Sequence, residues 1–114
     1  GVTADSAQSL RLSGASTTLS ETDQTISNDV TMIAATASLS VTMPNITDST
    51  VGRLYLIKDV AGNASSNNIT INQSAGGHDI DGADNPTAIV LESDSAAVQL
   101  LACSGSSGFF YAVF

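Results

Sequence analysis

Apolar and polar residues alternate with a period of two along most of the chain from Gln24 onward. In 39–43, for example, Leu, Val and Met occupy alternate positions with Ser and Thr between them. This is the period of a β-strand with one buried face. Runs of this kind recur with clusters of Gly, Asn, Asp and Ser between them, which are turn formers. The pattern predicts an all-β fold: an antiparallel β-sandwich, jelly-roll-like, or a barrel-like module.

The most apolar of the expected early strands is 51–59, where both faces carry mainly apolar side chains. A strand of this composition is expected to be buried on both sides at its centre. The composition of 60–68 predicts a loop, and 69–71 predicts a short strand. We expect 87–92 and 96–103 to pair as a hairpin across the intervening Ser-Asp-Ser turn.

The closing strand, 108–114, is apolar on both faces. Phe109 and Tyr111 lie on one face, and Phe110 and Phe114 lie on the other. A strand like this is prone to aggregate if it is left at a sheet edge. It is therefore expected to be central in a sandwich or covered by another subunit, and to anchor the core or the axis of an oligomer.

The chain is the length of one domain. Residues 1–23 are the least regular and are interpreted as an N-terminal arm or linker, with a short helix near Asp5–Gln8 as the alternative. Residues 24–114 are interpreted as a single all-β domain. No apolar stretch approaches the roughly 20 residues of a membrane span.

The charge of the chain excludes two classes of partner. The net charge is −8, and the basic residues are Arg11, Arg53 and Lys58. Binding to nucleic acid requires several clustered basic side chains, and binding to an anionic membrane is disfavoured for the same reason. Ser and Thr make up about a quarter of the chain. Such a surface suits packing against sister chains and, less specifically, contact with sugars.

Candidate catalytic residues are few. His78 is the only histidine and Cys103 the only cysteine, and Cys103 lies in an apolar run that predicts a small buried side chain. Nucleophilic catalysis would have to use His78, and the chain contains no G-x-S-x-G elbow. The carboxylates, among them Asp59 and Asp94, are interpreted as solvated or turn residues rather than as a glycosidase pair. We therefore expect no catalytic residue, no metal site and no cofactor.

Arg53 and Tyr55 stand within the apolar stretch 51–59. One interpretation of Arg53 is an ion pair or a cap on a carbonyl group within the chain. The other places it at a subunit interface, where a guanidinium can satisfy several acceptors at once. The candidate interface residues are Arg53, Tyr55, Phe109, Phe110, Tyr111 and Phe114.

The order of short motifs along 24–114 resembles a β-module common in tailed-phage fibres, tailspikes and other virion appendages. The motifs are Asp23-Gln-Thr-Ile26, the strand 39–44, the segment 52–59 with Gly62-Asn63, Ile69-Thr-Ile71, the segment 78–83 and the closing strand 108–113. The chain departs from the pattern in having no Trp and no Asp in the turn 104–108. The resemblance implies an all-β homotrimer on a virion surface and implies no catalytic site.

The sequence thus predicts a structural virion protein, outside the cell, that acts in trimeric assembly as a tail fibre, tailspike or capsid decoration module. Its expected partners are sister chains, other virion proteins and a glycan of the host surface. Two alternatives stay open. One is a non-viral extracellular filament or adhesin subunit that inserts its N-terminal arm into a neighbour. The other is a small hydrolase that uses His78 or a carboxylate pair.

Overall fold

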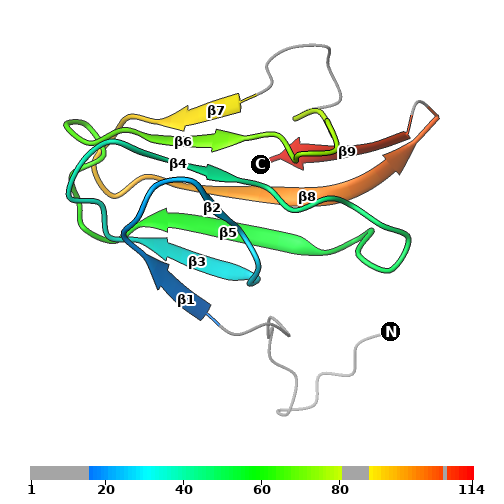
Figure 1. Cartoon of the computed structure of the whole chain (residues 1–114), viewed down its shortest axis with the longest axis horizontal. Helices are drawn as coiled ribbons and strands as arrows, with labels where there is room; N and C mark the ends of the chain where they lie inside the picture. The colour runs from blue at the N-terminus through cyan, green and yellow to red at the C-terminus, as the bar shows by residue number, and fades with distance from the viewer. Residues whose placement is uncertain (1–15, 81–87, 107) are drawn as a thin grey trace, which may run out of the picture.

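The computed structural model describes residues 16–80, 88–106 and 108–114. Within these ranges the chain forms two open β-sheets and no helix. The strands are β1 Ser16–Leu19, β2 Gln24–Thr25, β3 Val30–Ile33, β4 Leu39–Thr42, β5 Leu54–Asp59, β6 Ile69–Asn72, β7 Ala88–Leu91, β8 Ala97–Gly105 and β9 Gly108–Val113 (Figure 1). No helix in the described ranges is long and apolar enough to cross a membrane.

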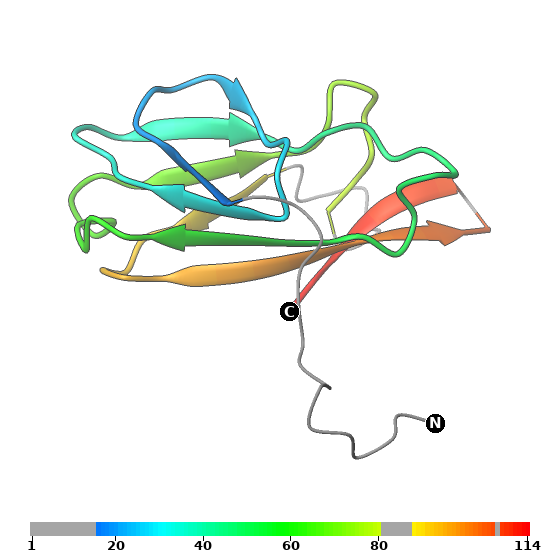
Figure 2. The same ribbon diagram turned by 90° about the horizontal axis from the view of Figure 1, so that it is seen from below.

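From β1 to β6 the chain alternates between the two sheets. The five-stranded sheet has the order β1-β3-β5-β8-β9, and the four-stranded sheet has the order β2-β4-β6-β7. Neighbouring strands among β1, β3 and β5 are parallel, as are those among β2, β4 and β6. The first six strands therefore make three turns of a flat two-layered coil, whose layers are seen edge-on in Figure 2. The last three strands extend the sheets beyond β5 and β6 with antiparallel pairs: β7 pairs with β6, and β8 pairs with β5 and β9.

The all-β prediction is confirmed, but its finer alternatives need correction. Among the described strands neither sheet closes on itself, so the barrel-like alternative is wrong. Both sheets are also mixed, so the antiparallel pairing expected for a sandwich or jelly roll holds only for β5–β8, β8–β9 and β6–β7. Alternation of polar and apolar residues gives the strand period but says nothing about strand direction, which depends on the path of the connecting loops.

The expected hairpin of 87–92 with 96–103 is also wrong. β7 pairs with β6 in the four-stranded sheet, whereas β8 pairs with β5 and β9 in the five-stranded sheet. The short connection at 92–96 therefore crosses from one layer to the other. Ser95, at the end of this crossing, has a φ of 64°, a left-handed conformation that few non-glycine residues adopt.

One hydrophobic core lies between the sheets. Alternate residues of the strands point into it, as the exposed fractions along β5 and β6 show. Its fully buried members include Ile33, Val41, Tyr55, Ile57, Ile69, Ile71, Leu100 and Tyr111. Burial of each large side chain contributes roughly 1.5–3 kcal/mol relative to leaving it in water. In β3 the buried residues are Thr31 and Ile33, so Val30 and Met32 point outward.

The folded unit begins before Gln24. Ser16–Leu19, which the sequence assigned to the N-terminal arm, forms β1 and pairs with β3 in the five-stranded sheet. Leu19 packs against the core. The rest of the expected arm, including the alternative helix near Asp5–Gln8, lies outside the described residues.

The closing strand does not lie at the centre of a sheet. β9 is the last strand of the five-stranded sheet, with β8 on one side. On its other side the Tyr111 N–H donates to the carbonyl of Asp79, 2.8 Å away, and Ile80 forms an isolated parallel bridge with Tyr111. The segment 79–80 thus contributes a single bridge to this edge. Of the two alternatives for β9, coverage by another subunit is the one that stays open.

Candidate functional site

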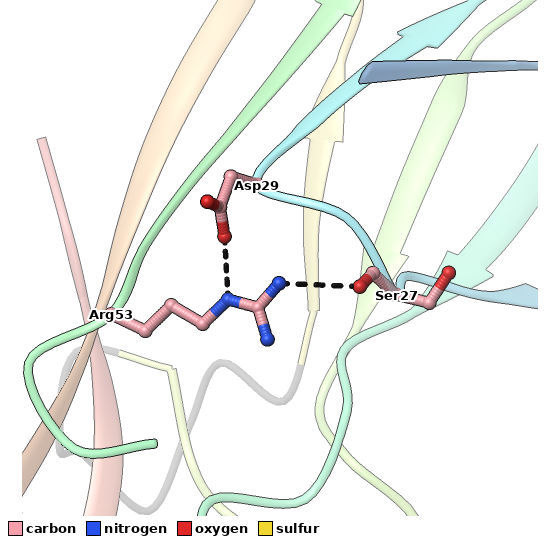
Figure 3. A network of polar contacts seen from close by, with 3 residues as sticks. All are labelled: Ser27, Asp29 and Arg53. Atoms are coloured by element: carbon pink, nitrogen blue, oxygen red, sulfur yellow. Dashed lines mark hydrogen bonds and ion pairs between the residues drawn. The ribbon is translucent and has the colours of Figure 1, made fainter. Parts of the chain in front are cut away.

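Arg53, at the entry to β5, holds the connection between β2 and β3 against the five-stranded sheet. Its Nε donates to Oδ1 of Asp29 at 2.5 Å, and its Nη2 donates to the carbonyl of Ser27 at 3.3 Å (Figure 3). The guanidinium carbon also lies 5.0 Å from the ring centroid of Tyr55, which is cation–π geometry. The bond to Asp29 raises the pKa of Arg53 above its ordinary value. Arg53 therefore makes the ion pair within the chain that was one of its two interpretations.

Tyr55 and Tyr111 face each other inside the core. Their rings meet edge to face with centroids 6.0 Å apart, and their side chains are 1% and 0% exposed. The Tyr111 hydroxyl donates to the carbonyl of Pro44 at 2.5 Å. Burial, more than any other cause, raises the pKa of both tyrosines. These two candidate interface residues thus lie in the chain's own core and have no surface to offer a neighbour.

The other aromatic candidates divide between the two faces of β9. Phe109 packs against the core and meets the ring of His78 edge to face, with centroids 5.5 Å apart. Phe110 is half-buried and, by the strand alternation, points to the outer face of the five-stranded sheet. Phe114 follows β9 and is 73% exposed. Of the six predicted interface residues, Phe110 and Phe114 are the aromatics that point away from the core.

Asp59, the last residue of β5, is a buried carboxylate that organises two loops. Its side chain accepts hydrogen bonds from the backbone N–H groups of Ala61 and Gly62 on Oδ1, and of Ala64 and Ser95 on Oδ2, at 2.9–3.1 Å. Burial alone raises the pKa of Asp59, but these backbone donors, led by Ser95, outweigh burial and hold the pKa below its ordinary value. Asp59 is a turn residue, as expected, but it is 0% exposed rather than solvated.

The only histidine is committed to the backbone. Nδ1 of the His78 ring accepts a hydrogen bond from the backbone N–H of Ile46 at 3.0 Å. The backbone N–H of His78 donates to Oγ of Ser74 at 3.1 Å. Next to it, Oδ1 of Asn45 accepts the N–H of Gly76 at 2.8 Å. A general base needs a free nitrogen lone pair aimed at a substrate proton. In this tautomer the lone pair of His78 is used to join two loops.

Cys103 lies in β8 and is half-buried, whereas the sequence predicted a fully buried side chain. Its thiol donates to the carbonyl of Leu101 at 3.4 Å, and Phe110 is its cross-strand neighbour. Among the described residues, no group of three or more His, Cys, Asp or Glu side chains lies close enough to hold a metal ion.

One shallow hollow on the four-stranded sheet is lined by neutral polar side chains and one leucine. It has a volume of about 370 Å³ and lies over the starts of β4 and β6. Within it, Oγ1 of Thr22 accepts the N–H of Ser40 at 3.0 Å, and the Ser40 hydroxyl donates to Asp23 at 3.1 Å. Its lining residues are Thr22, Ser38, Leu39, Ser40, Asn68 and Thr70. Hydroxyl and amide groups of this kind can hydrogen-bond a sugar, but the lining includes no aromatic ring on which a sugar could stack.

Sequence reasoning missed the roles of Asp29 and Asp59. The signal for Asp59 was its place at the end of an apolar strand, three residues before the turn formers Gly62-Asn63, where a carboxylate can accept backbone N–H groups. Asp29 had no comparable signal, because its partner lies 24 residues away. The chain matches no protein-family model and no curated protein.

Proposed function

We propose that this chain is a structural module of a virion surface, which assembles as a homotrimer in a phage tail fibre, tailspike or capsid decoration. The observation that carries this proposal is that its potentially reactive side chains are hydrogen-bonded within the chain. Asp59, Arg53 with Asp29, and His78 each bind groups of the chain itself. Side chains held in this way fix loop geometry and do not present their polar atoms to a substrate, which supports a structural role.

The sequence resemblance supports the placement on a virion, outside the cell, with other virion proteins as partners. The two-layered coil supports a mechanical role, because each turn is hydrogen-bonded to the next through both sheets. The hydroxyl-lined hollow at the start of β4 supports a second role in attachment to a host-surface glycan. Trimerisation would multiply such weak contacts through avidity.

A second function is favoured by one observation. β1 and β2 are the edge strands of their sheets at the same end of the coil. Open edges can accept a strand from another chain, so a non-viral extracellular filament or adhesin subunit is the second candidate. The two candidates differ in symmetry, because a trimer is closed whereas strand exchange along the coil produces an open fibre.

Deletion of residues 1–15 separates the two candidates, because it removes the expected arm and keeps β1. The trimer proposal predicts that light scattering gives the same number of chains per particle before and after deletion. A filament that depends on the arm would instead fall apart into single chains. The hydrolase alternative is tested by His78→Ala: loss of a measured hydrolytic activity, with the fold retained, would overturn the structural role.

A further inference from the structure

The outer face of the five-stranded sheet is apolar over four adjacent strands. Residues that alternate with the buried core positions of β3, β5, β8 and β9 point outward. The apolar ones among them, with Lys58 and Gln99 as polar neighbours, form what we call the apolar face, defined by Val30, Met32, Leu54, Leu56, Leu101, Cys103, Phe110 and Ala112. Each of these side chains is half-buried in the single chain.

The strand register joins these residues in a band. Val30 lies beside Leu56 on β3 and β5, and Leu54 lies beside Leu101, which in turn lies beside Ala112. The exposed Gln99 lies beside Leu56 on β8 and is a polar residue within this surface. Contiguous apolar patches of this kind on the surface of a single chain are often functional.

The outer face of the four-stranded sheet is more polar. Its outward positions on β4 and β6 are Ser40, Thr42, Thr70 and Asn72, and Val90 on β7, beside Thr70, is its exposed apolar residue. A sheet with one face on the core and one in water normally shows this pattern, apolar inside and polar outside. The five-stranded sheet breaks the pattern, and the described residues form no third layer to cover it.

Charge indicates what covers the apolar face. Each chain carries a net charge of −8, so two copies repel each other over most of their surfaces. The residues of the apolar face include no carboxylate. Among the described residues of these four strands, the charged side chain that shares the face is Lys58, which donates to the carbonyl of Ser95. The apolar face is therefore a surface through which copies of an acidic chain can approach without bringing like charges together.

We propose that the apolar face is the surface through which copies of this chain pack on one another, with Leu56 near its centre. This inference rests on the proposed homotrimer and names the part of the chain that builds it. It also gives β9 the covering subunit that an apolar terminal strand requires, because Phe110 and Ala112 become buried on assembly.

The test compares two variants that add the same charge to opposite faces. Leu56→Glu places a carboxylate at the centre of the apolar face, and Thr42→Glu places one at a half-buried outward position of the four-stranded sheet. Light scattering is expected to give single chains for Leu56→Glu and an unchanged oligomer for Thr42→Glu. Far-ultraviolet circular dichroism checks that both variants keep their β-structure.

Cys103 provides a second readout that needs no substitution. Its half-buried thiol lies on the apolar face beside Phe110, so assembly should shield it. Labelling with a maleimide is expected to be at least tenfold slower in the assembled chain than in chain dissociated by dilution. Equal rates would overturn the inference even if Leu56→Glu failed to fold.

The outcomes separate this inference from the proposed function. If the unmodified chain is oligomeric and Leu56→Glu remains so, the apolar face is not the interface, but the trimer proposal stands. If the unmodified chain is a single chain at all concentrations, the self-association of the face and the trimer are both contradicted.

Discussion

The carboxylate of Asp59 at the end of β5 accepts the backbone N–H of Ser95, 3.0 Å away, and so joins two loops separated by 36 residues. The same carboxylate binds three further N–H groups of the loop that follows β5. Ser95 ends the crossing from the four-stranded to the five-stranded sheet, where its left-handed φ turns the chain into β8. One buried side chain thus fixes the crossing that defines the topology of the closing strands.

Asp59→Asn tests this role. The amide oxygen can replace one carboxylate oxygen, but the amide NH₂ would face N–H donors at the position of the other oxygen. We expect the free energy of unfolding to fall by roughly 2–4 kcal/mol, since buried hydrogen bonds to a charged acceptor are lost. Urea unfolding measures the change. Asp94→Asn is the control, because Asp94 is an exposed carboxylate, bound to Ser65, and a change within about 0.5 kcal/mol is expected there.

Acid should destabilise the fold through the same residue. The folded state holds the pKa of Asp59 below its ordinary value of 3.8. Folding therefore favours the charged carboxylate, and the stabilisation that it gives to the folded state is fully present above pH 3.8. The contribution is lost as the pH falls from about 4 through the lower pKa of the folded state. Thermal melts between pH 6 and pH 2 should show a steeper loss of stability for the unmodified chain than for Asp59→Asn. Parallel curves would contradict this role of Asp59.

The ion pair of Arg53 with Asp29 is expected to contribute only modestly to the free energy of unfolding. Asp29 is 4% exposed but Arg53 is 35% exposed, so solvent weakens their attraction. A double-mutant cycle with Arg53→Ala and Asp29→Ala should give a coupling energy of about 1 kcal/mol. Arg53→Ala should leave the oligomeric state unchanged, because its contacts lie within one chain. Dissociation of Arg53→Ala would favour the interface interpretation instead.

Thr31 marks a position that can be improved. Its side chain is 0% exposed on the inner face of β3, and its hydroxyl has no hydrogen-bond partner among the described residues. An unpaired buried hydroxyl costs roughly 1–3 kcal/mol, so Thr31→Val should raise the free energy of unfolding by about 1 kcal/mol. Thr42→Val, on the outer face of the other sheet, should change it by less than about 0.5 kcal/mol. A destabilised Thr31→Val would show that the hydroxyl is satisfied in solution.

Alkaline conditions should unfold the core through its two tyrosines. Their folded-state pKa values are raised above 10.0, so folding favours the neutral phenols, and this contribution is complete below that value. It is lost as the pH rises above 10.0 through the raised pKa values. Tyr111→Phe should reduce this alkaline sensitivity. It should also cost roughly 1 kcal/mol at neutral pH, because the carbonyl of Pro44 loses its donor. Tyrosinate absorbance during a pH titration follows the transition.

The sequence predicts the strands of this fold better than their arrangement. The strands at Leu39–Thr42, Leu54–Asp59 and Ile69–Asn72 follow directly from local alternation. The parallel pairs and the separation of β7 from β8 do not, because they depend on where each loop returns. The sequence could not show whether Tyr55 and Tyr111 lie in the chain's own core or at an interface. An apolar strand has the same composition whether it packs on its own core or on a neighbouring chain. The inward position of Thr31 and outward position of Met32 reverse what hydrophobicity alone favours.

The most direct test of the central claim is the mass of the particle in solution, measured by light scattering over a range of concentrations. The account predicts a particle of three 11.5 kDa chains for the unmodified protein, and single chains for Leu56→Glu. A single-chain mass for the unmodified protein at every concentration would contradict it.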